Sequence, residues 1–161
     1  PIFGTLIALL SDGEPILGII DQPVLGERWV GALGQRSSFN GEEINTRDCG
    51  DLGHATLNTT GPELFDDANG EAFNRLGDKV RNTLYGGDCY ADGLLASGFI
   101  DLVVEAQLKP YDFCALIPVV TGAGGVMTDW QGEKLTLESD GRVIAAGDKA
   151  LHASALKVLS P

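Results

Sequence analysis

The sequence is poor in basic residues and contains no long apolar run. Of its 161 residues, 11 are Lys or Arg and 23 are Asp or Glu, which gives a net charge of −12. Binding to a phosphate backbone needs a surface rich in Lys and Arg, so we expect no nucleic-acid partner. No segment approaches the ~18 uninterrupted apolar residues of a membrane span, and no basic-then-apolar signal peptide opens the chain. We therefore expect no membrane partner.

Methionine is nearly absent as well. The chain begins with Pro1, and its one methionine is Met127. An intact translation product starts with methionine, whereas here a strand-like apolar run follows Pro1 at once. We therefore expect a chain that is processed, trimmed or part of something longer.

Cysteine and histidine are also scarce. Cys49, Cys89 and Cys114 show no Cys-x-x-Cys spacing, which indicates reduced thiols and a cytoplasmic location. Cys89 and Cys114 lie among apolar residues and are expected to fill the core rather than act as nucleophiles. His54 and His152 have no metal-ligating neighbour in the sequence and are expected in ordinary surface roles. The chain thus offers little for a Ser/His/Asp or Cys/His hydrolase.

The sequence does contain 43% hydrophobic residues, enough for a packed core, and they are arranged in two successive patterns. Residues 1–53 are typical of antiparallel strands, with a hairpin turn at Ser11-Asp12-Gly13 and a tight turn at Asn40-Gly41. The expected strands span Ile2–Leu10, Glu14–Asp21, Glu27–Leu33 and, as a short segment, Glu43–Asn45.

Residues 54–161 alternate between strand and helix patterns, which indicates an α/β layer and an α/β fold class. The expected strands span Ala55–Thr59, Asn82–Tyr85, Leu102–Ala106, Gly124–Thr128 and Val143–Ala146. The expected helices span Glu71–Lys79, Asp88–Ser97, Tyr111–Ala123 and Lys149–Leu159. The last helix is amphipathic, with one apolar face formed by Leu151, Ala155, Leu156 and Leu159.

Two acids near the middle of this second pattern could carry chemistry. Glu105 ends an apolar strand, where a single carboxylate is costly to bury unless it is paired or used. Asp112 falls in the first turn of an expected helix, after Pro110, where the helix dipole favours an acid. Capping is the simpler interpretation of Asp112. The same position also projects a carboxylate from the rim of a sheet, where hard cations such as Mg²⁺ are held.

Two glycine-rich segments flank these acids. Gly86-Gly87 follows an expected strand and leads into an expected helix, so N–H groups there could meet an anion or a polar substrate, and Asp88 could cap the helix. By contrast, Gly122-Ala123-Gly124-Gly125 follows a helix and precedes a strand, the reverse of the order in anion-binding loops. We expect it to end a helix.

Two motifs that lie close together carry a resemblance to a known family. They are Pro110-Tyr111-Asp112-Phe113-Cys114-Ala115 and Gly122-Ala123-Gly124-Gly125-Val126. Together they resemble the C-terminal signature of the inositol monophosphatase family, whose members are Mg²⁺-dependent, lithium-sensitive phosphomonoesterases. The branch that hydrolyses histidinol phosphate is similar almost throughout GGDCYADGLLASGFIDLVVEAQLKPYDFCALIPVV, and also to FGTLIALL and VIAAGDKALH. The resemblance covers essentially all 161 residues.

The resemblance implies the layered α/β/α/β/α architecture of this family. Residues 1–53 would be antiparallel strands of its first sheet, and residues 54–161 its C-terminal α/β subdomain, which binds substrate and metal. Asp112 would be a metal ligand, while Glu105, Asp88, Gly86 and Gly87 would bind the substrate. The family mechanism uses Mg²⁺ to neutralise the phosphate, activate a water as nucleophile and stabilise the departing alkoxide. No catalytic residue is assigned within this chain.

The sequence also departs from the family pattern. The other metal carboxylates of the family sit in a Glu-Glu pair and an Asp-Pro-x-Asp-Gly-Thr motif, upstream of the segment that matches Ile2–Leu10. Neither motif is found ahead of Ile2–Leu10 in this sequence. Thr121 stands where the family usually has Glu, and Asp92 stands where Tyr or a neutral residue is expected.

We therefore expect the parent protein to hydrolyse histidinol phosphate with Mg²⁺ in histidine biosynthesis, its substrate being a small phosphorylated metabolite. The intact protein would be a homodimer, and this chain would be an incomplete part of the enzyme and inactive alone. One alternative is an inositol monophosphatase or broad sugar phosphatase. Another, of a different class, is a non-catalytic fragment that folds or assembles only with a missing partner segment, since an unpaired apolar edge favours association.

Overall fold

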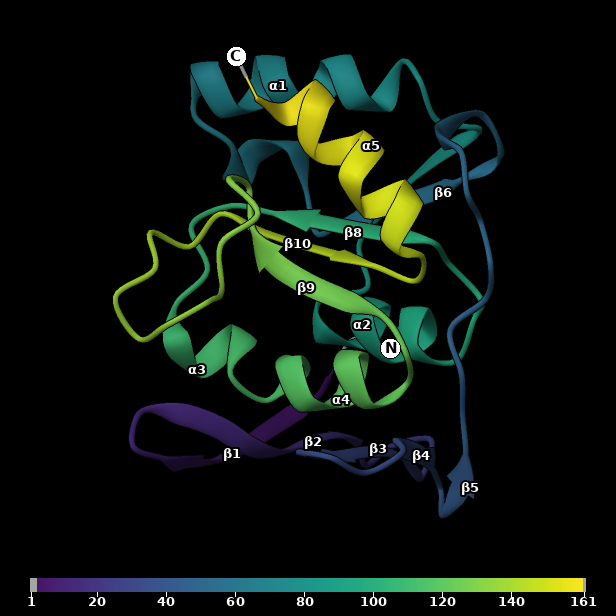
Figure 1. Cartoon of the computed structure of the whole chain (residues 1–161), viewed down its shortest axis with the longest axis vertical. Coiled ribbons are helices and arrows are strands. Elements are labelled where there is room, and N and C mark those ends of the chain that lie inside the picture. The colour runs from purple at the N-terminus through teal and green to yellow at the C-terminus, as the bar shows by residue number, and fades with distance from the viewer. Residues whose placement is uncertain (1–2, 161) are drawn as a thin grey trace.

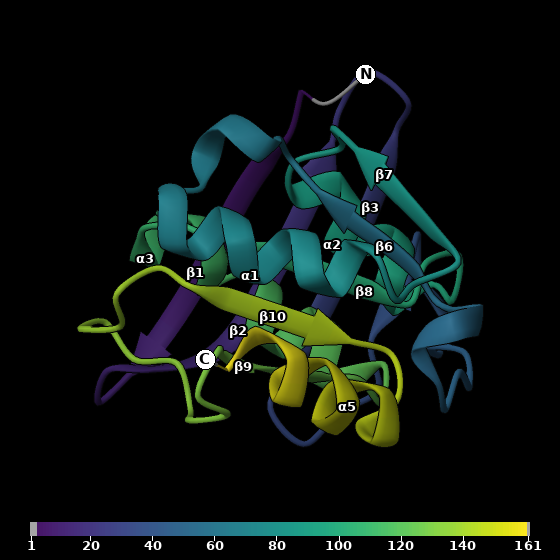
Figure 2. The same cartoon turned by 90° about the horizontal axis from the view of Figure 1, so that it is seen from above.

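The computed structural model describes residues 3–160, and its elements form four layers (Figure 1). A five-stranded antiparallel sheet forms one outer layer, and the helices α2, α3 and α4 lie between it and a second five-stranded sheet. The helices α1 and α5 cover the far face of that second sheet (Figures 1 and 2). The expected α/β architecture with two sheets is therefore confirmed.

The first sheet follows chain order from β1 to β5. Its strands are β1 (Thr5–Ser11), β2 (Glu14–Gln22), β3 (Glu27–Ala32), β4 (Ser38–Phe39) and β5 (Glu42–Glu43). The predicted β1–β2 hairpin is confirmed, and its turn residues Asp12 and Gly13 have φ of 51° and 81°, as the favoured tight hairpin turns require. The predicted start of this strand at Ile2 lies outside the described residues. The two-residue strand β4 was not predicted.

Two glycines let this sheet lie against the helices beneath it. A Cβ atom on Gly18 of β2 would lie 1.9 Å from the carbonyl oxygen of Ala115, and one on Gly31 of β3 would lie 2.3 Å from that of Pro118. Such distances are far below van der Waals contact, so only glycine permits this approach. The two glycines are paired across the strands, which places both contacts side by side.

The second sheet has the order β7-β6-β8-β10-β9. Its strands are β6 (Thr56–Thr59), β7 (Asn82–Tyr85), β8 (Leu102–Glu105), β9 (Val126–Asp129) and β10 (Val143–Ala146). Strands β6, β7 and β8 are parallel to one another, whereas β10 runs antiparallel to both β8 and β9. The carboxyl ends of β6, β7 and β8 therefore meet at one edge, where ligands of open α/β sheets usually bind.

The helices largely match the predicted ranges, with two corrections. They are α1 (Asp67–Gly77), α2 (Cys89–Ala96), α3 (Pro110–Phe113), α4 (Leu116–Gly122) and α5 (Lys149–Leu159), with short 3₁₀ turns at Leu52–His54 and Pro62–Leu64. The single helix predicted over Tyr111–Ala123 was wrong. The structure has two helices there, α3 and α4, separated by a turn at Cys114 and Ala115. Helix α1 starts earlier than predicted, because the Asp66 side chain accepts the Asn69 N–H at 2.8 Å and caps it.

Two apolar clusters hold the layers together. The first lies between the sheets, around Trp29, Phe113 and Val119, and the second lies under α1 and α5, around Leu76 and Ile144. Cys114 is buried in the first cluster and Cys89 packs against it, which confirms that both fill the core. Within residues 3–160, no helix has both the length and the apolar character to cross a membrane.

The prediction for His152 was wrong. This residue is 7% exposed on the inner face of α5, and its ring nitrogen Nε2 lies 2.9 Å from the Thr128 hydroxyl. Leu156, which was assigned to that apolar face, is only half-buried. The buried face of α5 therefore includes His152 and is centred slightly away from Leu156. Burial lowers the pKa of His152.

Candidate functional site

The structure brings three predicted site residues to one pocket at the carboxyl edge of the parallel strands. Asp88 lies at the start of α2, Glu105 at the end of β8 and Asp112 in α3. The residues that line the pocket are Leu6, Thr60, Asp88, Cys89, Asp92, Glu105, Leu108, Asp112 and Leu116. Elements far apart in the sequence thus place four carboxyl groups around one hollow.

Glu105 is fixed in the floor of this pocket. Its side chain is 5% exposed, and its Oε1 accepts the Thr60 N–H at 2.7 Å and the Thr60 hydroxyl at 2.9 Å. The Thr59 hydroxyl donates to Oε2 at 3.1 Å. Burial raises the pKa of Glu105, although these three hydrogen bonds oppose the rise. The carboxylate is therefore buried and oriented, with its position set by the end of β6.

Asp112 caps α3 and also faces the pocket. Its Oδ2 accepts the backbone N–H of Lys109 at 2.7 Å, which confirms the capping interpretation. This bond engages one oxygen, so the other retains lone pairs that could bind a cation, and a carboxylate oxygen is the donor that Mg²⁺ prefers. Asp112 thus fits as one ligand of a Mg²⁺ ion. Over the described range, no group of three or more His, Cys, Asp or Glu residues could hold a metal by itself.

The predicted glycine loop shapes the mouth of the pocket without lining it. Gly86 and Gly87 have φ of 82° and 106°, and Asp88 follows with φ of 49°, so the chain turns sharply between β7 and α2. The Gly86 N–H donates to the carbonyl oxygens of Thr59 and Thr60, both at 3.0 Å, and so is engaged within the protein. Substrate binding by Gly86 and Gly87 stays a prediction. Asp88 is exposed and accepts the Cys89 N–H at 2.9 Å, as expected of a helix cap.

Asp92 was noted in the sequence as a departure from the family pattern and was not assigned to the site. It lies one helical turn after Asp88 and lines the same pocket, with 4% of its surface exposed. Burial raises its pKa well above the ordinary value, and the nearby charges of Glu105 and Asp88 add to this. An acid four residues after Asp88 in an otherwise apolar helix was the signal that could have revealed it.

Among the described residues that line the pocket, Cys89 alone carries a sulfur, and it is a poor nucleophile. Burial raises the pKa of its thiol to about 12, with contributions from Asp88 and Asp92. Because the thiolate is the reactive form, the thiol is inert near neutral pH. The chemistry of the pocket therefore rests on its carboxyl groups.

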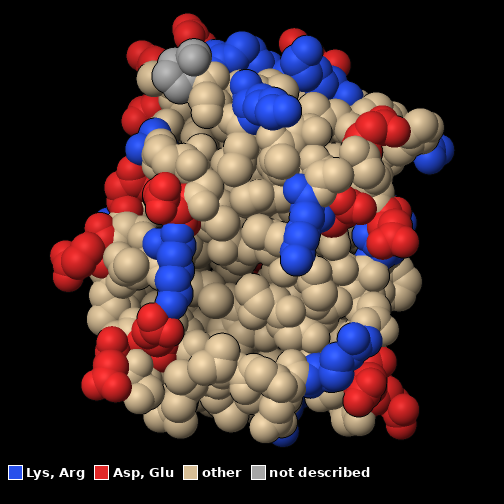
Figure 3. All heavy atoms as spheres, viewed as in Figure 1, with Lys and Arg blue, Asp and Glu red and all other residues tan. Residues whose placement is uncertain are grey.

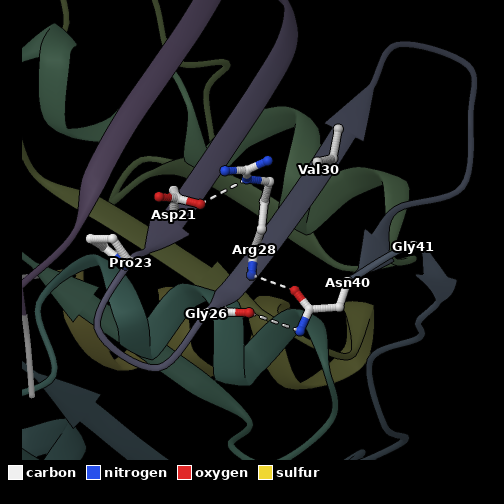
Figure 4. Close-up of a pocket in the computed structure, with 7 residues that line it drawn as sticks. All are labelled: Asp21, Pro23, Gly26, Arg28, Val30, Asn40 and Gly41. Atoms are coloured by element: carbon white, nitrogen blue, oxygen red, sulfur yellow. Dashed lines mark hydrogen bonds and ion pairs between the residues drawn. The ribbon is translucent and has the colours of Figure 1, made fainter.

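A larger hollow lies elsewhere, at the edge of the first sheet (Figure 4). Its polar groups satisfy one another: Arg28 Nε binds Asp21 Oδ1 at 2.7 Å, and the Arg28 N–H donates to Asn40 Oδ1 at 2.8 Å. The Asn40 amide nitrogen donates to the Gly26 carbonyl oxygen at 3.1 Å. These hydrogen bonds hold together the turns that join the strands. Although this hollow is larger, its polar groups are already paired, so we do not take it as the candidate site.

Figure 3 shows one face of the molecule, on which several Lys and Arg side chains gather at the top of the view. Lower down, Lys and Arg side chains lie next to Asp and Glu side chains, and much of the remaining surface carries no charged group. Surface ion pairs among the described residues include Arg142–Asp140, at 2.6 Å. Exposed pairs of this kind contribute little to stability.

Comparisons with known proteins agree with this geometry. The sequence pattern of the inositol monophosphatase family matches residues 1–160. The chain is 54% identical to the bifunctional phosphatase IMPL2, chloroplastic, of Arabidopsis thaliana, over 99% of this chain and 48% of that protein. It is 31% identical to a histidinol-phosphatase of Chlorobaculum parvum, over 90% of this chain and 56% of that protein. A solved inositol monophosphatase from Zymomonas mobilis is 55% identical, with a TM-score of 0.97 over 99% of this chain and 63% of that chain. The chain thus spans about half the length of the curated relatives it matches.

Proposed function

The chain belongs to the inositol monophosphatase family, and from that premise we propose that the protein containing it is a Mg²⁺-dependent phosphomonoesterase acting on histidinol phosphate. One observation carries the proposal: Asp88, Glu105 and Asp112 lie around a single pocket at the carboxyl edge of the parallel strands. The likeness to the histidinol-phosphatase of Chlorobaculum parvum supports the choice of substrate.

Each of these residues has a distinct role in the proposal. Asp112 holds one coordination position of the metal, and its bond to the Lys109 N–H fixes the direction of the carboxylate. When bound, Mg²⁺ supplies the positive charge that neutralises the phosphate and stabilises the leaving alkoxide. Glu105, locked by Thr59 and Thr60, orients the alcohol part of the substrate.

The charge of the pocket favours a cationic alcohol. Asp88 stands at its exposed rim, and Asp92 and Glu105 form its buried floor. Histidinol carries an amine and an imidazole, whereas inositol carries only neutral hydroxyl groups. A carboxylate-lined pocket attracts the former more strongly because opposite charges attract most where water is excluded. Gly86 and Gly87 place the start of α2, and with it Asp88, at the mouth of this pocket.

The test is phosphate release from histidinol phosphate with and without Mg²⁺, in parallel with inositol 1-phosphate. We expect the protein that contains this chain to prefer histidinol phosphate, and strong preference for inositol 1-phosphate would overturn the substrate assignment. We expect no release by the 161 residues alone, because Asp112 is one ligand and Mg²⁺ needs several. Turnover by the 161 residues would refute that expectation.

An inositol monophosphatase or broad sugar phosphatase is the second candidate, and the 55% identity to the Zymomonas mobilis enzyme favours it. Asp88 discriminates between the two candidates, because only a cationic substrate benefits from its charge. Under the histidinol proposal, Asp88→Ala lowers kcat/KM for histidinol phosphate and spares neutral polyol phosphates. Equal effects on both substrates would favour the second candidate.

A candidate of another class is an assembly fragment that needs a partner segment. The edge strand β1 supports it, since Ile7 and Leu9 are 52% and 54% exposed and apolar edges promote association. Sedimentation of the isolated chain tests this: a soluble, folded monomer of 16.9 kDa would contradict dependence on a partner. Separately from this candidate, we propose that the intact phosphatase is a homodimer in the reducing cytoplasm, which suits the free cysteines of the chain.

A further inference from the structure

Asp92 has a buried carboxyl oxygen that nothing in the described residues satisfies. The side chain is 4% exposed, and its Oδ1 has no hydrogen-bond partner. Among residues 3–160, only Asn58 has another such buried oxygen. A buried polar group without a partner is rare in native proteins and calls for an explanation.

A purely structural role does not account for this carboxyl group. Asp92 does not cap α2, because Asp88 already does so one turn earlier. Within the described chain it forms no ion pair, and its charged neighbours are Glu105 and Asp88, which are themselves acidic. An uncompensated acid at this position costs stability, so the residue is suited to a partner that arrives from outside the chain.

The position of Asp92 points that partner into the pocket. Asp92 and Glu105 line the buried end, and Asp88 lines the exposed end. Three hydrogen bonds occupy Glu105, and an ionised carboxylate has about four lone-pair sites, so it can accept one more. A ligand group that binds at this end of the pocket must therefore donate hydrogen bonds to more than one of these acids.

The size of the pocket restricts this group further. Its cavity volume is about 20 Å³, which is room for one group the size of a water molecule. An imidazolium or polyol ring is too large for this space, so the proposed metal, the phosphate and the rest of the alcohol would lie outside it, toward its mouth. A primary ammonium group fits, because it is compact, carries a positive charge and presents three N–H donors.

We propose that Asp92 is a specificity-determining residue that, together with Glu105 and Asp88, binds a primary ammonium group on the alcohol part of the substrate. This inference rests on the proposed phosphatase function and deepens it, since it assigns the amine rather than the imidazole of the alcohol to the pocket floor. Binding of the cation also removes the electrostatic cost of the buried acids, because an opposite charge favours their ionised forms.

The test compares two substrates that differ by one amine, histidinol phosphate and its deaminated analogue, in the protein that contains this chain. Asp92→Asn keeps the shape of the side chain and removes its charge. We expect kcat/KM for histidinol phosphate to fall about 10- to 100-fold, mainly through KM, because the carboxylate charge that strengthens the hydrogen bond from the ammonium group is lost. For the deaminated analogue we expect a change within about twofold. The exposed Asp67→Asn in α1 is the matched control and should change neither value.

Binding of the free alcohol gives a readout that does not depend on phosphatase activity. Calorimetry should show that the wild type binds histidinol more tightly than deaminated histidinol, and that Asp92→Asn reduces this difference, while Glu105 and Asp88 still contribute to it. If the protein hydrolyses other phosphomonoesters instead, phosphoethanolamine and ethyl phosphate form the equivalent pair. If the protein does not hydrolyse histidinol phosphate, the proposed substrate is overturned. If Asp92→Asn weakens the binding of amine and non-amine ligands equally, or weakens neither, the proposed role of Asp92 is overturned.

Discussion

Arg47 and Asp101 form a two-pronged ion pair that ties the segment after the first sheet to the second sheet. Arg47 Nε lies 2.6 Å from Asp101 Oδ1, and Arg47 Nη2 lies 2.6 Å from Oδ2, which also accepts the Thr56 N–H at 2.7 Å. Burial alone would raise the pKa of Asp101, but the bonds from Arg47 and Thr56 outweigh it and hold the pKa below its ordinary value. The pair therefore anchors the segment that joins the two sheets.

Arg47→Met should lower the free energy of unfolding by about 2–3 kcal/mol, because Asp101 is fully buried and would lose its charged partner. Asp101 has a lowered folded-state pKa, so its contribution is present above about pH 4 and is lost as the pH falls further. The difference between variant and wild type should shrink in the same range. Urea unfolding at several pH values measures this. The control is Arg28→Met, whose partner Asp21 keeps 22% of its side chain exposed, so this surface pair should contribute less than about 1 kcal/mol. Equal losses in both variants would contradict the prediction.

Gly18→Ala should destabilise the protein by about 3 kcal/mol, because the added Cβ would lie 1.9 Å from the Ala115 carbonyl oxygen. Relief requires β2 to move away from the junction of α3 and α4, which directly follows the helix that contains Asp112. Gly50→Ala is the matched control, since a Cβ there meets nothing within 4 Å and its φ is ordinary. Thermal unfolding of both variants measures the effect, and a Gly18→Ala protein as stable as Gly50→Ala would show that the layers can separate without cost.

The sequence predicted most elements but not where the layers touch. Strands β7 and β10 and helix α5 match their predicted bounds because local periodicity and turn residues define them. The break at Cys114 and Ala115 could not be predicted, since the apolar pattern continues through it. That junction lies where Gly18 brings β2 against the Ala115 carbonyl, a contact between residues almost a hundred positions apart.

The candidate site shows the same division. Glu105 could be predicted as a site residue because it is a lone acid in an apolar strand. Asp88 and Asp112 could be predicted from their positions at helix starts and from the family resemblance. Asp92 could not be assigned, because its importance depends on which side of α2 faces β8. His152 was misplaced for a similar reason, since a polar residue in an amphipathic helix does not reveal its partner Thr128.

Asp112→Asn separates the capping role of this residue from its proposed metal role. The Asn side-chain oxygen can still accept the Lys109 N–H, so the free energy of unfolding should change by less than about 1 kcal/mol. Activity of the intact protein should fall at least about 100-fold, because loss of a direct ligand exceeds the effect of changing its supporting groups. Phosphate release titrated with Mg²⁺, alongside unfolding curves, measures both. Asp112→Ala should lose the cap as well, and an Asp112→Asn protein with full activity would exclude this residue from the metal site.

Asp92→Asn should stabilise the ligand-free protein at pH 7 by about 1–2 kcal/mol, because a buried acid beside other acids disfavours the folded state when ionised. The folded-state pKa is raised above the unfolded value of about 3.9. The contribution of the protonated acid is therefore complete below about pH 4 and is lost as the pH rises through the folded-state pKa. Urea unfolding at pH 4 to 7 should show the two proteins converging at low pH and diverging toward neutrality, with Asp67→Asn unchanged throughout. Added histidinol should reverse the order by stabilising the wild type more than the variant. A variant that is less stable than the wild type at pH 7 without ligand would mean that an internal partner, and not a ligand, satisfies this carboxyl group.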